Sequence, residues 1–161
     1  MNKTIKSLIT ITTLFILTTS SVFAFSPRKK QQVIDATYNY ISTYKLDEYA
    51  TFDVCFGNCS GDGECYTYVE NGKIIVEITY SNSTWNSMTK NIWLDTIAHE
   101  IAHAACDIAT MKSGIKDTST HGDAWKSCYK IVWRNLGKLG YEANGYECNI
   151  HYDNMDYYNV D

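Results

Sequence analysis

Three residues within a stretch of five have the types and spacing of a metal site that does chemistry. His99, Glu100 and His103 form an H-E-x-x-H pattern. Two histidines four residues apart on a helix lie on one face, about one turn from each other, so both imidazoles could bind one zinc ion. The glutamate between them would lie near the open coordination position and could take a proton from water there. The implied chemistry is metal-assisted hydrolysis, most often of a peptide bond.

A catalytic zinc ion usually has three protein ligands and one water, so one ligand remains to be found. The candidates elsewhere in the chain are two histidines and three aspartates: His121, His151, Asp107, Asp117 and Asp123. We favour His121, because it opens the next predicted helix, and packing of that helix against the first would bring it to the ligand face. Asp107 is better placed to orient a ligand imidazole through its other ring nitrogen. His151 lies in an irregular tail and is expected at the surface.

The hydrophobic pattern predicts the elements that must position these residues. It indicates a helix over about 27–44, a strand near 50–56, strands over 65–70 and 73–80, a long helix over about 86–109, and a helix that starts after 121 and ends near 136. Asn71-Gly72 between two β-type runs is a strong hairpin signal. These elements predict an α+β fold with an N-terminal helix, a small three-stranded sheet, and a motif helix packed against the C-terminal helix.

The segment after the motif makes the pattern more specific. His121, Gly122, Trp125 and Lys126 form an H-G-x-x-W-K element that follows the motif helix after a variable loop. Together with the preceding β-type run, these features resemble the SprT-like family of zinc metallopeptidases over about residues 33–140. The H-E-x-x-H pattern alone is shared by many zincin families, and the later element is what points to this one. We interpret Trp125 as a core residue on the apolar stripe of its helix rather than as a residue that binds substrate.

The resemblance implies both a fold and a set of roles. The fold would be a minimal zincin-like core, with His99, His103 and His121 as zinc ligands and Glu100 as the general base. The better-known SprT-like proteins are intracellular, are linked to proteolysis of DNA–protein crosslinks, and often carry a zinc ribbon or another DNA-binding module. This chain has no four-cysteine ribbon, and the family's role in DNA repair is therefore not expected here.

The first 24 residues have the composition of a secretory signal peptide. Lys3 and Lys6 precede a short apolar run over 8–17, and small residues precede a cleavage site after Ala24. An uncleaved N-terminal anchor is the alternative, although the run is short for a membrane span. Cleavage would leave 12 basic and 18 acidic residues, a net charge of −6, with no stable membrane anchor. Such a charge is unfavourable for nucleic acid. Residues 25–140 would then form the catalytic domain and 141–161 a Tyr/Asn-rich tail.

Six cysteines follow the predicted cleavage site, at 55, 59, 65, 106, 128 and 148. An even number of cysteines after an export signal favours disulfides. Cys106 and Cys128 should lie where the two metal-bearing helices meet, and we predict a bridge between them; two buried free thiols are the alternative. The other four allow three pairings, of which we favour one bridge within 55–65 and one from that region to Cys148. A cysteine metal site is less consistent with their spacing.

These observations predict an exported zinc metallopeptidase, an endopeptidase that acts on a protein or peptide substrate. One alternative is a secreted zinc-binding module of the same fold that interacts with partners without catalysis. Another is a protease directed at nucleoproteins outside its own cytoplasm, which the acidic charge disfavours. The sequence leaves open the substrate, the oligomeric state and the choice between a periplasm, a secretory compartment and the extracellular space.

Overall fold

The computed structural model describes residues 27–85, 90–114 and 121–141, and the side chains of 90–92 are not among those described. The elements in order are α2 (Pro27–Thr43), a short 3-10 helix (Leu46–Glu48), β1 (Thr51–Gly57), β2 (Gly63–Glu70), β3 (Lys73–Ser81), α3 (Lys90–Ser113) and α4 (Asp123–Lys138). The predicted α+β class and element order are confirmed. The predicted signal peptide, Asp117, Cys148 and His151 lie outside the described residues. None of the described helices is long and apolar enough to cross a membrane.

The sheet has three strands in the order β1-β3-β2. β1 pairs with β3 in parallel and β2 pairs with β3 antiparallel, so β2 is an edge strand. Asn71 and Gly72 join β2 to β3 with φ angles of 51° and 76°, as expected of a tight hairpin turn in which both central residues need positive φ. The predicted hairpin is therefore confirmed, but β2 begins two residues earlier than expected, at Gly63.

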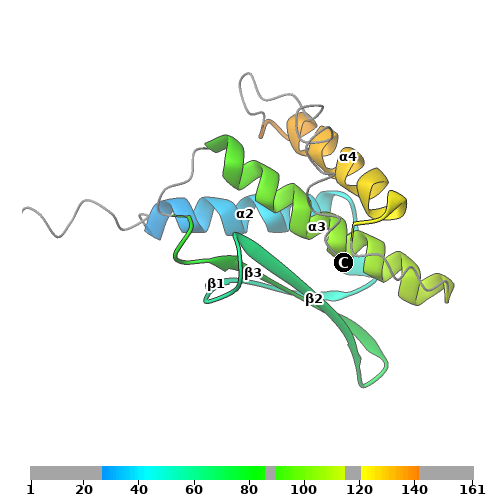
Figure 1. The fold of residues 1–161 in the computed structure, drawn as a ribbon. Helices are drawn as coiled ribbons and strands as arrows, with labels where there is room; N and C mark the ends of the chain where they lie inside the picture. Colours follow the sequence, from blue (N-terminus) through cyan, green and yellow to red (C-terminus); the bar gives the residue numbers. More distant parts are fainter. Residues whose placement is uncertain (1–26, 86–89, 115–120, 142–161) are drawn as a thin grey trace, which may run out of the picture.

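Helix α3 lies in the middle of the molecule. Figure 1 shows α2 and α3 on the same side of the sheet, with α4 packed on the far side of α3. α3 is therefore buried on more than one side: Ile97, Ile101, Ala104 and Ile108, which recur at helical spacing, are buried, and Ala105 is partly exposed. The core joins α2, the sheet, α3 and α4 through apolar side chains that include Val33, Ile41, Val76, Ile78, Ile97, Ile101, Val132 and Leu136. This packing fixes the motif helix between the edge of the sheet and α4.

Candidate metal centre

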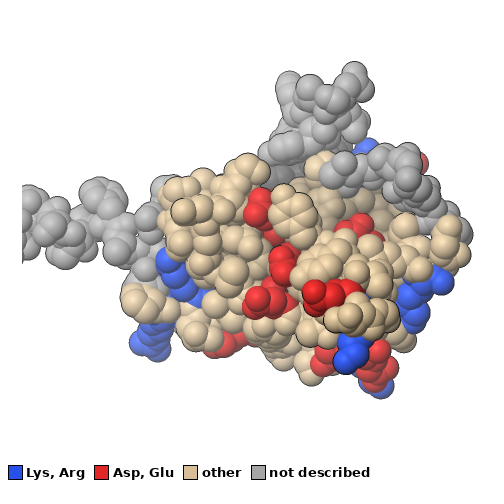
Figure 2. Space-filling view, turned by 90° about the horizontal axis from the view of Figure 1, so that it is seen from below, with Lys and Arg blue, Asp and Glu red and all other residues tan. Residues whose placement is uncertain are grey.

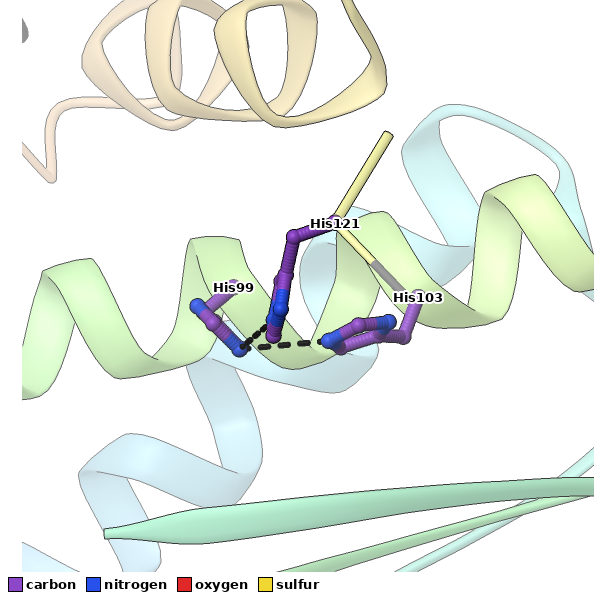
Figure 3. A group of neighbouring side chains, drawn as sticks. All are labelled: His99, His103 and His121. Carbon is purple, nitrogen blue, oxygen red and sulfur yellow. Dashed lines mark hydrogen bonds between the residues drawn. The ribbon is translucent and has the colours of Figure 1, made fainter. Parts of the chain in front are cut away.

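Three imidazoles converge beside α3. His99 and His103 lie on successive turns of that helix, and His121 comes from the segment immediately before α4 (Figure 3). The Nε2 atom of His99 is 3.2 Å from that of His103 and 3.2 Å from that of His121. These three side chains could hold a metal ion. The structure thus brings together all three residues predicted as ligands, whereas Asp123, weighed as an alternative, is exposed on the first turn of α4.

The packing of α4 on α3 places His121. Trp125 lies in the first turn of α4 and is 2% exposed. Its ring centroid lies 4.8 Å from that of His99, 5.2 Å from that of His103 and 4.6 Å from that of His121. The tryptophan is therefore a core residue, as predicted, and also a wall against which all three imidazoles rest. Tyr129 stacks on it at 5.3 Å, extending this wall along α4.

Burial keeps two of the imidazoles in the form that binds metal. Desolvation, followed by the neighbouring His121, lowers the pKa of His103 to about 4. Burial also lowers the pKa of His121. A neutral imidazole has a free nitrogen lone pair, and protonation competes with metal binding. These two side chains therefore offer that lone pair across the neutral pH range.

Glu100 lies beside the three imidazoles, and its side chain is a buried carboxyl group. Glu100 is only 4% exposed and lines two adjoining cavities, of about 560 and 520 Å³. His99 and His121 also line both cavities, and His103 lines the larger one. Burial, then the charges of Glu64 and Asp62, raise its pKa to about 8. A carboxyl group with such a raised pKa beside a cluster of metal ligands is a candidate for proton transfer.

The start of β2 forms the wall opposite α3. Gly63, Glu64, Cys65 and Tyr66 line the larger cavity together with the motif residues. Lysine and arginine are missing from the walls of both cavities, as far as the chain is described. On the face drawn in Figure 2, acidic side chains gather near the middle and basic ones lie towards the periphery. Sequence reasoning missed this wall, because the residue pattern predicts a strand that begins only at 65, whereas β2 begins at Gly63.

Asp107 and Cys106 also line the larger cavity, beyond His103. Burial raises the pKa of Asp107, and its role in orienting a ligand imidazole stays a prediction. None of the five cysteines in the described part of the chain is in a disulfide. Burial raises the pKa of Cys128 and a hydrogen bond with Cys106 lowers it, so these two thiols meet between α3 and α4 as expected. The bridge between them stays a prediction, as do the pairings of the other cysteines.

Comparison with known proteins gives no match from which the role of this site could be inferred. The chain matches no protein-family model, and no curated protein matches it.

Proposed function

We propose that this chain is an exported zinc metallopeptidase of the SprT-like type, with Glu100 as its general base. The observation that carries the proposal is the meeting of three imidazoles and one buried carboxyl group in a single cavity. Either element alone has an ordinary structural explanation. Their combination at the H-E-x-x-H spacing is the arrangement that zinc-dependent hydrolysis needs.

The donor set fits zinc in chemistry and in size. A tetrahedral zinc ion with Zn–N bonds of about 2.0–2.1 Å separates its nitrogen ligands by roughly 3.3 Å. The observed Nε2–Nε2 distances of 3.2 Å agree with that separation. Three protein ligands also leave a fourth position open, which is the usual difference between catalytic and structural zinc sites. His99, His103 and His121 would therefore hold the ion.

The protein's own residues would supply the remaining steps. A bound zinc ion acts as a Lewis acid and lowers the pKa of water. The Glu100 carboxylate would accept a proton from the water that attacks the scissile carbonyl, and would then pass the proton to the leaving amine. Trp125 would hold the imidazoles in place and keep bulk water from one side of them. The peptide would be bound in the cavity between α3 and the start of β2.

A peptide substrate is also supported by the shape of the site. β2 is an edge strand whose residues 63–66 line the larger cavity. An extended peptide can add to such an edge through its backbone, which makes a strand beside the site a natural place for a polypeptide. The packing also explains two residues of the H-G-x-x-W-K element. His121 converges with the motif histidines, and Trp125 packs against all three imidazoles. Export by residues 1–24 is part of the same proposal.

The test uses residues 25–161, the expected mature chain. We expect about one zinc ion per chain by elemental analysis and cleavage of a denatured protein that a chelator abolishes. Glu100→Gln should keep zinc and lower kcat by about 10²–10⁴-fold. His121→Ala should lose zinc and activity together. Asp123→Asn is the matched control, because it changes an exposed acid two residues from His121 that lines neither cavity. Cleavage by Glu100→Gln at the wild-type rate would exclude the assigned role, and zinc binding without any cleavage would favour a binding module.

A further inference from the structure

Gly63 lies where the first residue of β2 meets the side chain of Glu100. An ideal Cβ at this position would lie 2.9 Å from Oε1 of Glu100, 3.1 Å from its Cγ and 3.2 Å from its Cδ. The outer half of the glutamate therefore lies over the glycine Cα. Real Cβ atoms are essentially never found closer than 3.0 Å to another heavy atom. Any side chain at position 63 would have to displace either the carboxylate or the strand.

The backbone of Gly63 does not itself require glycine. Positive φ angles are found at Gly61 and Gly72, where an added Cβ would meet nothing within 4 Å, and Gly63 is not among such residues. At those two glycines the conformation excludes a side chain, because left-handed backbone is unfavourable for other residues. At Gly63 the requirement is space, and the group that fills the space is the carboxylate of Glu100.

The strand is the less movable of the two groups. Gly63 pairs with Tyr80 on β3. The carbonyl oxygen of the preceding Asp62 accepts hydrogen bonds from the Ser81 backbone N–H at 3.0 Å and from Nε1 of the fully buried Trp85 at 2.8 Å. A shift of the strand would break these bonds in the core, whereas the glutamate can change rotamer. An added methyl group would therefore move the carboxylate.

We propose that Gly63 is a positioning residue, whose missing side chain allows the β2 backbone to lie against Glu100 and hold its carboxylate at the metal site. The inference rests on the proposed function only for its effect on catalysis. The contact itself belongs to the fold and can be tested without any substrate. The three atoms nearest an added Cβ at Gly63 all belong to Glu100, so zinc content is not expected to change with this contact.

The chain contains a matched control for this contact. An ideal Cβ at Gly57, near the end of β1, would lie 2.9 Å from Cγ2 of Thr79, and neither residue lines the two cavities. Gly57→Ala therefore introduces the same methyl group, in the same sheet, at the same distance from a neighbour. The group that it displaces is Thr79 on β3 and not Glu100.

The first experiment measures zinc content, KM and kcat of Gly63→Ala and Gly57→Ala, both made in residues 25–161 and assayed in the presence of zinc. Gly63→Ala should keep wild-type zinc content and a KM within a few-fold of wild type. Its kcat should fall about 100-fold, since misplacing a catalytic group by about 1 Å has an effect of that order. Gly57→Ala should keep kcat. The proposal is overturned if Gly63→Ala keeps kcat, loses zinc, or loses no more activity than Gly57→Ala.

The second experiment needs no activity and separates the inference from the proposed function. Denaturant midpoints are measured for the metal-free wild type, Gly63→Ala, Glu100→Ala and the double variant. Gly63→Ala should lower the midpoint in the wild-type background and have little effect in the Glu100→Ala background, where the carboxylate is gone. Equal effects in the two backgrounds would show that Glu100 is not the group displaced, and would overturn the proposal. A wild-type chain that cleaves nothing would contradict the proposed function, while this cycle would still decide whether Gly63 positions Glu100.

Discussion

Two aromatic clusters of this protein differ in how their polar atoms are paired. The first, here the sheet cluster, consists of Phe56, Tyr80 and Trp85, with ring centroids 5.2–5.6 Å apart. Its polar atoms have partners within the core: the Tyr80 hydroxyl lies 2.8 Å from the Thr37 hydroxyl, and Nε1 of Trp85 donates to a backbone carbonyl. Nothing in this cluster requires a ligand.

The second, here the histidine cluster, consists of Trp125 and the three imidazoles at 99, 103 and 121. Nε1 of Trp125 is buried and has no hydrogen-bond partner among the described residues. The Nε2 atom of His99 lies 3.2 Å from the Nε2 atoms of His103 and His121. A buried polar atom without a partner, such as Nε1 of Trp125, is unfavourable by about 1–3 kcal/mol. The comparison teaches that aromatic burial is common to both clusters, and that the convergence of three imidazole nitrogens distinguishes the histidine cluster.

The largest effects should come from removing the two indoles. Trp85→Ala and Trp125→Ala should each lower the free energy of unfolding of the metal-free chain by about 3–5 kcal/mol, since both rings are buried. Only Trp125→Ala should also weaken zinc binding, by about 10–100-fold, because only this ring supports the ligands. Denaturant titrations and a competition titration with a zinc chelator measure the two quantities. Equal zinc affinities in the two variants would contradict the distinction between the two clusters. If the alanine variants do not fold, the corresponding Trp→Phe variants provide the same test.

A smaller effect should be seen in the pH dependence of the metal-free chain. The Glu100 pKa is raised from 4.5 to about 8, so the folded state binds the extra proton and loses stability as pH rises from about 4.5 towards 8. The His103 pKa is lowered from 6.5 to about 4, so stability is lost as pH falls through that interval. Glu100→Gln should therefore be more stable than wild type at pH 8, by at most about 5 kcal/mol, and the difference should vanish near pH 4. Unfolding free energies at several pH values, with chelator present, check this; a wild-type chain as stable as the variant at pH 8 would contradict it.

The smallest effect is expected in the sheet cluster. Tyr80→Phe removes a paired hydroxyl and leaves Thr37 its bond to the Val33 carbonyl at 2.9 Å. The free energy of unfolding should fall by about 1 kcal/mol, the usual contribution of such a bond. Zinc affinity should stay that of the wild type. A change in zinc affinity would show that the sheet cluster is coupled to the site and would remove the distinction between the two clusters.

The site was predictable to the extent that its geometry is local. His99 and His103 meet because the helix repeat brings residues four apart together, and the turn at Asn71-Gly72 follows from two adjacent residues that accept positive φ. The prediction of His121 as the third ligand depended on the expectation that α4 would pack on α3. The H-G-x-x-W-K element supported that expectation.

The remaining features depend on contacts between distant segments. Gly63 lies 37 positions before Glu100, and no spacing rule connects them. The parallel pairing of β1 with β3 was likewise not predicted, because the residue pattern of a short strand gives its faces but not its neighbours. The carboxyl groups of Asp62 and Glu64 come close to Glu100 only once β2 lies against α3.

The order of strands in the sheet has a consequence for how the protein folds. β2 and β3 are joined by a two-residue turn, and such hairpins form within about 1–10 μs. β1 pairs with β3 across a longer stretch of chain, so its docking has a larger loop-closure entropy to overcome. The wall that holds Gly63 can therefore be made early, from one continuous segment. The histidine cluster, which joins α3 to the segment before α4, must wait for the helices to dock.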